Sequence, residues 1–415
     1  MNYIIKNNIY EKKIRTEFIW NSNLSKFISN LSCTGGTSFE TIENENIFIE
    51  AKNNIDNNLI NFDVTDWYNR FNIEVENITY EEISNIEQIL SCIGQIRRLD
   101  IIVVFEKKIK AIINQNSFTI KDNVKLTLNL IAIIKLKNEE IILKKEKIIM
   151  QYDNGKLYNS LLDLANEVTF PYKTIIDNTC YDLTGKTKDI DILLPSGLSG
   201  IFIHEAIGHS LEGDTFFEDD SFFKNKLYKR ITNNNNIIIK DLYNYQGGIC
   251  EDYSDDGSKC ENVTLVENGI LTGVMTNQII SKKYKVLNTG NGRRANYYDF
   301  SLPRMRNTLL EPGNHNVSEI YDNVNFGLIA LDINGGNVNI NNGNFVFQIS
   351  QGVIIQNGEI VKIAKPYLFI GNISNALDSI VKIGCDIKFN NAICGKKGQY
   401  IDVSYGAPTI QISYQ

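Results

Sequence analysis

The sequence predicts an α+β fold, with an N-terminal part that mixes helices and antiparallel strands and a C-terminal part that is mostly antiparallel sheet. Apolar residues recur at helical spacing in the first half, whereas Asn-Gly dipeptides between apolar runs punctuate the second. The length of 415 residues favours two domains with separate cores. A polar stretch marks their boundary, which gives domains at 1–185 and 186–415.

Two helices are predicted in the first half. Thr79 and Glu82 have the spacing of a capping box, and apolar residues follow at helical intervals over 83–93. A second amphipathic stretch covers 157–168. These helices are expected to pack against the sheet of the same domain.

Strands are predicted at 101–105 and 124–136, where β-branched residues and alternating leucines are concentrated. The polar residues 121–123 are expected to form a turn before the second of these strands. The N-terminal part is therefore expected to hold an antiparallel sheet.

Hairpins are predicted in the second half at Asn268-Gly269, Asn342-Gly343 and Asn357-Gly358. A type I′ turn needs positive φ at both central residues, and Asn-Gly meets this need at little cost. No repeat of 20 to 50 residues is visible, which excludes solenoids and propellers.

Composition limits the classes of function. The formal net charge of −7 and a pI near 5.3 argue against direct nucleic-acid binding. The N-terminus has scattered charges and no apolar signal core, and no segment is apolar enough to span a membrane, so we expect a cytoplasmic protein. Seven dispersed cysteines without CxxC spacing indicate reduced thiols.

One short segment concentrates the residues that carry chemistry. Only three histidines occur in the chain, and His204 and His209 lie five residues apart with Glu205 directly after the first. Neutral imidazoles bind zinc, and an adjacent carboxylate can accept a proton from water, as in HExxH sites. The alternative is that the two histidines only pack or cap. The glutamate within an apolar helix favours a metal site.

The spacing of this motif, HExxxH, has one residue too many for a regular helix. Residues four apart are separated by about 40° around the helix axis, but residues five apart by about 140°. The two imidazoles of His204 and His209 would then diverge. We therefore predict an irregularity, either a π-bulge or a break at Gly208.

A catalytic zinc site usually has three protein ligands and an open position. Residue type alone offers His315, Glu212, Asp214 or a cysteine as the third ligand. Spacing does not decide among them.

The segment from Ile192 to Asp214 resembles the metal-binding segment of the TldD branch of the TldD/PmbA family. Four further blocks follow in the family's order, so that the five blocks together span about 210 residues. They are Thr289-Gly290-Asn291-Gly292-Arg293-Arg294, Leu302-Pro303-Arg304-Met305-Arg306-Asn307-Thr308, Gly335-Gly336 and Cys394-Gly395-Lys396-Lys397-Gly398-Gln399.

The resemblance implies a zinc metallopeptidase in which Cys394 is the third ligand beside His204 and His209, and Glu205 is the general base. Cys385 is expected to be structural. An arginine of the family-like blocks is expected to stabilise the transition state, and we select Arg304. Arg293, Arg294 and Arg306 are the other candidates, and all four have a substrate-binding or partner-binding role as the alternative.

The resemblance also implies a TldE/PmbA-like partner subunit, in a heterodimer or alternatively a homodimer. The expected substrates are short or unfolded peptides, for turnover or leader-peptide removal. The main alternative is a non-catalytic peptide-binding or regulatory subunit with a structural zinc closed by four protein ligands. The family's association with DNA gyrase suggests a DNA-related modulator, against which the acidic composition weighs.

Overall fold

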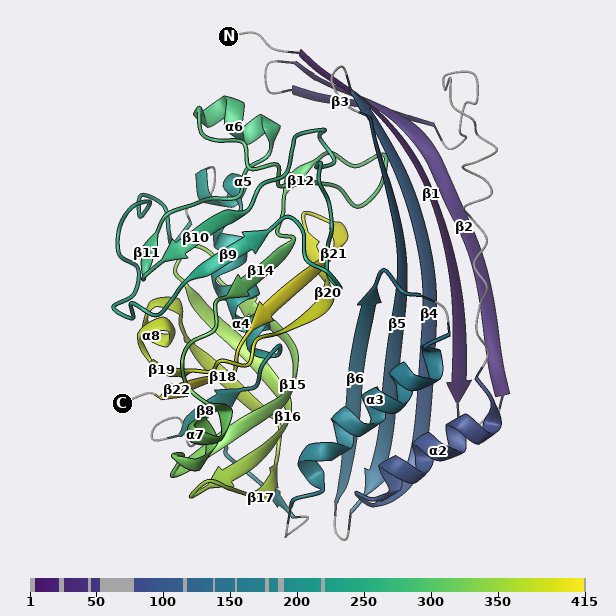
Figure 1. Cartoon of the computed structure of the whole chain (residues 1–415), viewed down its shortest axis with the longest axis vertical. Coiled ribbons are helices and arrows are strands. Elements are labelled where there is room, and N and C mark those ends of the chain that lie inside the picture. Colours follow the sequence, from purple (N-terminus) through teal and green to yellow (C-terminus); the bar gives the residue numbers. More distant parts are fainter. Residues whose placement is uncertain are drawn as a thin grey trace.

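A computed structural model of the chain describes residues 4–21, 26–43, 46–52, 78–114, 118–136, 139–153, 155–175, 179–185, 190–217 and 221–413. Side chains are described from residue 78 onward, except at 111–120 and 122. The chain has the predicted α+β fold. Figure 1 shows a long curved N-terminal sheet beside a C-terminal body that contains the other sheets.

The N-terminal sheet is antiparallel throughout and has the strand order β3-β2-β1-β4-β5-β6. Its strands are β1 (Ile4–Asn21), β2 (Lys26–Glu43), β3 (Asn46–Lys52), β4 (Gln95–Asn114), β5 (Phe118–Lys135) and β6 (Glu140–Met150). Helices α2 (Tyr80–Ser91) and α3 (Leu157–Thr169) lie across the part formed by β4–β6 (Figure 1). Their apolar faces share one core with β4 and β5.

Both predicted helices are confirmed. Thr79 caps α2, because its side chain accepts a hydrogen bond from Glu82 N at 3.3 Å and its own amide donates to Glu82 Oε2 at 2.8 Å. The predicted strand 101–105 falls within β4, and the predicted strand 124–136 falls within β5 except for its last residue.

The turn predicted at 121–123 is wrong, because β5 runs through these residues without interruption. The Nζ atom of Lys121 lies 2.7 Å from Asp255 Oδ1 and 3.2 Å from Glu251 Oε1. A polar side chain that is paired with another part of the molecule is compatible with a strand interior. The polarity of these three residues therefore led to a predicted turn where the chain forms a strand.

The C-terminal half contains a six-stranded sheet of order β11-β10-β9-β14-β21-β20 and an eight-stranded sheet of order β19-β22-β8-β15-β16-β17-β7, in which β18 also pairs with β16. The six-stranded sheet is made of β9 (Ile239–Leu242), β10 (Val263–Glu267), β11 (Ile270–Leu271), β14 (Asn307–Leu310), β20 (Lys388–Lys396) and β21 (Gln399–Ala407). The eight-stranded sheet is made of β7 (Cys180–Tyr181), β8 (Asp191–Leu194), β15 (Phe326–Val338), β16 (Asn344–Gln356), β17 (Glu359–Ala364), β18 (Tyr367–Asn372), β19 (Ile380–Ile383) and β22 (Ile410–Ser413). A small two-stranded sheet pairs β12 (Gly292–Arg293) with β13 (Leu302–Pro303). Most pairs are antiparallel, and the parallel exceptions are β8/β15, β14/β21 and β7/β17.

The Asn-Gly dipeptides form the predicted turns in two of three cases. Asn268-Gly269 and Asn357-Gly358 have positive φ at both residues, at 49° and 77° and at 50° and 81°. At 342–343 only Gly343 has positive φ, at 76°, and the connection between β15 and β16 is longer. The hairpin there still forms, with Val338 opposite Phe345.

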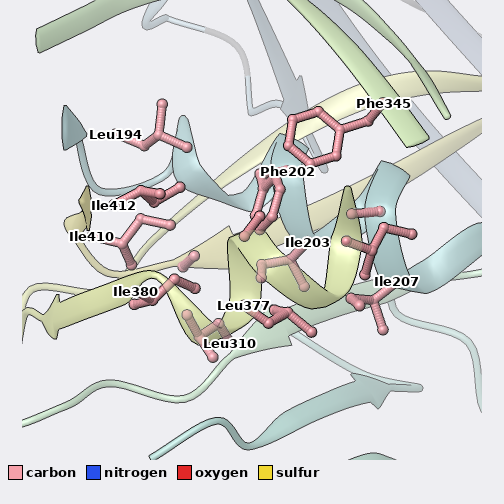
Figure 2. Close-up of a cluster of buried hydrophobic side chains, with 14 of the residues drawn as sticks. Leu194, Phe202, Ile203, Ile207, Leu310, Phe345, Leu377, Ile380, Ile410 and Ile412 are labelled. Atoms are coloured by element: carbon pink, nitrogen blue, oxygen red, sulfur yellow. The ribbon is translucent and has the colours of Figure 1, made fainter. Parts of the chain in front are cut away.

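Short helices complete the C-terminal half: α4 (Ser199–Ile203), α5 (Gly213–Phe217), α6 (Gln278–Tyr284), α7 (Val317–Asp322) and α8 (Ile373–Asp378). Helix α4 lies inside the core of this half. Figure 2 shows Phe202, Ile203 and Ile207 among apolar side chains of both sheets and of α8. The ring of Phe202 meets that of Phe345 edge to face at 5.6 Å. Packing against both sheets and α8 fixes the rotation of the helix that carries the His-Glu motif.

Partly buried polar contacts join the N-terminal sheet to the C-terminal half. Lys125 Nζ on β5 lies 2.7 Å from Asp402 Oδ1 on β21, and Asn391 on β20 donates to the carbonyl of Ile148 on β6 at 2.9 Å. The division into domains at residue 185 stays a prediction.

Candidate metal centre

The segment with the two histidines is one helix that changes its hydrogen-bond pattern. The α-helical turn of α4 ends at Ile203, a π-helix spans His204–Gly208, and a 3₁₀ turn spans His209–Leu211. The amide of His209 donates to the carbonyl of His204, five residues earlier. The predicted irregularity is therefore present as a π-helix, and it brings the imidazole centroids of His204 and His209 to 4.9 Å.

Gly208 serves this segment through its small size. Its φ of −56° is helical, so the break that was the second expected form of irregularity does not occur. A Cβ at this position would lie 2.0 Å from Met305 Sδ. Glycine is needed because Met305 packs directly against the π-helix.

Cys394 reaches the two histidines from a distant part of the chain. It lies on β20, and its Sγ is 3.3 Å from Nε2 of His204 and 3.3 Å from Nε2 of His209. Candidate ligand atoms of these three residues lie within 4.8 Å of one another. His204 and Cys394 are buried, and His209 is half-buried.

The spacing of the three atoms fits a zinc ion. Tetrahedral zinc, with bonds of about 2.0–2.1 Å to nitrogen and 2.3 Å to sulfur, places a nitrogen and a sulfur ligand roughly 3.5 Å apart. The observed 3.3 Å separations are close to this value. In the part of the chain that the structure describes, no fourth histidine, cysteine or carboxylate joins the group. Such a set leaves one position open.

The electrostatics of the site favour a thiolate. Burial alone would raise the pKa of Cys394, but the charge and hydrogen bonds of His204 and His209 lower it to about 4. Burial would lower the pKa of His209, yet Glu212 and Cys394 hold it well above its ordinary value. A thiolate is the form of cysteine that binds metals.

Glu205 lies at the solvent side of the cluster. Its side chain is 29% exposed, and its Oε2 is 3.9 Å from His209 Nε2. A carboxylate that is partly exposed and adjacent to the ligands is placed to exchange a proton with water at the open side.

Arg304, predicted to stabilise a transition state, is placed otherwise. Its side chain has no exposed surface. Nη2 donates to the carbonyl of Cys394 at 2.7 Å, and Nε lies 3.5 Å from Glu212 Oε1. The transition-state role is not supported by this placement, because the guanidinium is enclosed and holds the backbone of a proposed ligand instead.

The other arginines of the family-like blocks also point inward. Arg293 Nη1 donates to the carbonyls of Met305 and Asp402, each at 2.8 Å, and Arg306 Nη2 donates to the carbonyl of Gly290 at 2.6 Å. These contacts tie loops of the chain to one another. Gly290, which has a φ of 69°, forms a tight turn.

The remaining candidates for the third ligand do not join the cluster. The ring of His315 faces the carbonyl of Ile383 at 3.1 Å, and Cys385 is exposed beside it. Asp214 pairs with Lys396 and Lys397. Glu212 binds the far nitrogen of His209, as described below.

Two neighbours of the cluster were not singled out from the sequence. Lys396 follows Cys394 by two residues, and its Nζ lies 2.9 Å from Glu212 Oε2. The ring of Tyr405 packs 5.9 Å from that of His204, and burial raises the pKa of its phenol. Chain proximity to Cys394 was a signal for Lys396. No local pattern marks Tyr405.

The fold and the site define an α+β protein with a His₂Cys cluster, of the kind that binds zinc. Residues 187–414 match the model of the PmbA/TldA metallopeptidase C-terminal domain. The chain therefore belongs to the TldD/PmbA family.

Curated relatives carry the TldD name. The chain is 36% identical over 225 residues to a metalloprotease TldD homolog of Buchnera aphidicola, a match that covers 53% of this chain and 46% of the relative. It is 31% identical over 249 residues to a zinc metalloprotease TldD homolog of Saccharolobus solfataricus, covering 60% and 55%. The chain thus spans about half the length of the curated relatives it matches.

The fold is also that of a solved structure. TldE from Thermococcus kodakarensis superposes with a TM-score of 0.71 at 12% identity, over 99% of this chain and 97% of the other. No helix among the described residues is long and apolar enough to cross a membrane.

Proposed function

We propose that this protein is a zinc metallopeptidase that hydrolyses short or unfolded peptides, in peptide turnover or leader-peptide removal. The observation that carries the proposal is that His204 Nε2, His209 Nε2 and Cys394 Sγ lie together beside the partly exposed Glu205. Relatives named as metalloproteases support it.

The ligands and Glu205 have separate proposed roles. His204, His209 and Cys394 would hold the zinc, which when bound supplies a Lewis acid that makes water a better nucleophile. Glu205 accepts a proton from the attacking water and returns it to the leaving amine. The convergence of three ligands rather than four favours this reading over a structural zinc.

The strand that carries Cys394 supports a peptide substrate. β20 is the edge of its sheet in the described structure and pairs there with β21 alone. An extended peptide can add to such an edge through main-chain hydrogen bonds, which ask little of its sequence. We propose that unfolded peptides bind alongside β20.

A partner subunit is part of the proposal. The chain shares its fold with a TldE structure over nearly its full length, and the family resemblance implies pairing of two subunits with this fold. We propose a heterodimer with a TldE/PmbA-like subunit, or otherwise a homodimer, in the cytoplasm. Light scattering of the chain alone and with such a subunit distinguishes the two.

Glu205→Gln tests the mechanism. The zinc-loaded full chain, alone and with a TldE-type subunit, is incubated with unfolded peptides, and the fragments are quantified by mass spectrometry. We expect Glu205→Gln to keep its zinc and lose roughly 10²- to 10⁴-fold in rate. Glu261→Gln, at an exposed glutamate, is the control. Cleavage by Glu205→Gln at the wild-type rate would refute the proposed base.

A further inference from the structure

Glu212 is a fully buried carboxylate surrounded by three basic side chains. Its Oε2 lies 3.0 Å from His209 Nδ1 and 2.9 Å from Lys396 Nζ, and its Oε1 lies 3.5 Å from Arg304 Nε. Its exposed fraction is 0%. A carboxylate in this position is costly to bury unless its charge is matched on all sides.

The contact with His209 fixes which ring nitrogen faces the cluster. With Nδ1 donating to Glu212, Nε2 is left as the nitrogen that points to Cys394 Sγ, at 3.3 Å. A carboxylate behind a metal-binding histidine orients the ring and raises its basicity. Among the described residues, Nδ1 of His204 has no hydrogen-bond partner, so only one of the two rings is held this way.

The other two partners of Glu212 hold the strand that carries Cys394. Lys396 lies two residues beyond Cys394 on β20, and Arg304 donates to the carbonyl of Cys394 at 2.7 Å. One carboxylate therefore connects the histidine-bearing helix with the cysteine-bearing strand. His209 and Cys394, which these two elements carry, lie 185 residues apart in the sequence.

The backbone at Glu212 is itself fixed. Glu212 forms a parallel bridge with Met275, in which the amide of Gly213 donates to the Met275 carbonyl at 2.7 Å and the amide of Met275 donates to the Leu211 carbonyl at 3.0 Å. The carboxylate thus has a defined position immediately after the 3₁₀ turn.

We infer that Glu212 is a positioning residue that orients His209 and joins the helix to β20, so that the His₂Cys cluster is assembled before a metal binds. This inference rests on the proposed function, because it assigns Glu212 a role toward the zinc. It makes Glu212 a support of the ligands and not a ligand.

Glu251 offers a matched control for a charge-removing substitution. It also faces three cations, with Lys121 Nζ at 3.2 Å, Arg306 Nε at 3.0 Å and Arg293 Nε at 3.5 Å. Among the described contacts, none of these cations touches a side chain of the His₂Cys cluster. Glu251→Gln and Glu212→Gln therefore remove the same charge from similar surroundings.

The experiment measures zinc affinity of the full chain by competition with a chromophoric chelator. We expect Glu212→Gln to lose roughly 10- to 100-fold in affinity and Glu251→Gln to keep the wild-type value. Cobalt(II) loading adds a spectroscopic readout, in which the d–d bands shift in Glu212→Gln alone. Equal affinity and spectra in Glu212→Gln and wild type, or equal losses in both variants, would overturn the inference.

A second measurement needs no substitution. The chain has only three histidines, so ¹⁵N-histidine labelling yields three imidazole spin systems. In the zinc form we expect one zinc-bound ring with a slowly exchanging, downfield Nδ1 proton. Fast exchange of the Nδ1 protons on both zinc-bound rings contradicts the role of Glu212. Failure of the wild type to bind zinc refutes the proposed function instead, which separates the two claims.

Discussion

Two clusters of buried charge lie in the C-terminal half, one around Glu212 and one around Glu251 and Asp255. Each surrounds carboxylates with lysine and arginine side chains at ion-pair distance. Burial would raise the carboxyl pKa in both, yet the surrounding cations hold the pKa of Glu212 and of Asp255 well below the ordinary range.

The clusters differ in what they connect. The partners of Glu212 are His209 and the residues that hold β20, so this cluster ends at the proposed ligands. Asp255 instead binds Lys110 of β4 and Lys121 of β5, at 3.2 Å and 2.7 Å. The same kind of ion pairing thus contacts the proposed metal ligands in one place and joins the N-terminal sheet to the C-terminal half in the other.

The largest expected effect comes from a substitution at the proposed ligands beside the Glu212 cluster. Cys394→Ser replaces the thiolate that lies between both imidazoles, and we expect the variant to lose stoichiometric zinc, because a hydroxyl is a poor zinc ligand. Elemental analysis after dialysis measures the content. Cys260→Ser, at a buried cysteine outside the cluster, is the control and should keep its zinc. One zinc per chain in Cys394→Ser argues against the ligand set.

The next largest effect is expected from a substitution in the cluster around Glu251 and Asp255. Asp255→Asn removes a buried carboxylate that lies 3.2 Å from Lys110 Nζ and 2.7 Å from Lys121 Nζ, and we expect about 3–5 kcal/mol less free energy of unfolding. Zinc affinity should stay unchanged. Urea unfolding and chelator competition measure the two quantities, with the exposed Asp252→Asn as control. A loss of zinc affinity without a loss of stability would reverse the distinction between the clusters.

A smaller effect is expected from filling the space between the π-helix and Met305. Gly208→Ala places a methyl group against Met305, and we expect a destabilisation of about 1–3 kcal/mol together with weaker zinc binding. The clash predicts a favourable coupling with Met305→Ala, because the smaller side chain makes room. A double-mutant cycle of urea unfolding measures this coupling. Additive effects would show that the contact does not constrain the π-helix.

The smallest expected effect is the pH dependence of the stability that Glu251 contributes. Burial would raise the pKa of Glu251, but Lys121, Arg293 and Arg306 lower it to about 2. Because this pKa is below that of the unfolded chain, the stabilisation is complete above the unfolded value and is lost as pH falls through about 2. The stability difference between wild type and Glu251→Gln should shrink between about pH 5 and pH 2. A constant difference over this window contradicts the ion pairing.

The sequence predicted local features well. The capping box at Thr79, the helix from Leu157 and two type I′ turns each depend on a few neighbouring residues, and all are present. Helix geometry predicted an irregularity here, either a π-bulge or a break at Gly208, once both histidines were taken as ligands. The π-helix at His204–Gly208 is present and the break is not, and Gly208 instead provides space for Met305.

Contacts between distant segments limited the rest. Residues 121–123 were predicted to form a turn because they are polar. The acidic partners of Lys121 lie more than 120 residues away in the sequence, so the local pattern does not reveal them. No local sequence pattern indicates that Arg304 is buried against the backbone of Cys394. Arg304 was therefore predicted to be a catalytic hydrogen-bond donor. Cys394 itself was assigned by resemblance, since spacing alone left several ligands open. Strands β1–β3 had no counterpart among the predicted elements.

X-ray absorption at the zinc edge of the loaded full chain tests the central claim most directly. The account predicts one sulfur at about 2.3 Å, two imidazole nitrogens at about 2.0–2.1 Å and one further light atom that is not a protein ligand. The sulfur shell should disappear in any zinc that Cys394→Ser retains. A zinc shell without sulfur, or one closed by four protein ligands, would contradict a catalytic His204, His209 and Cys394 site.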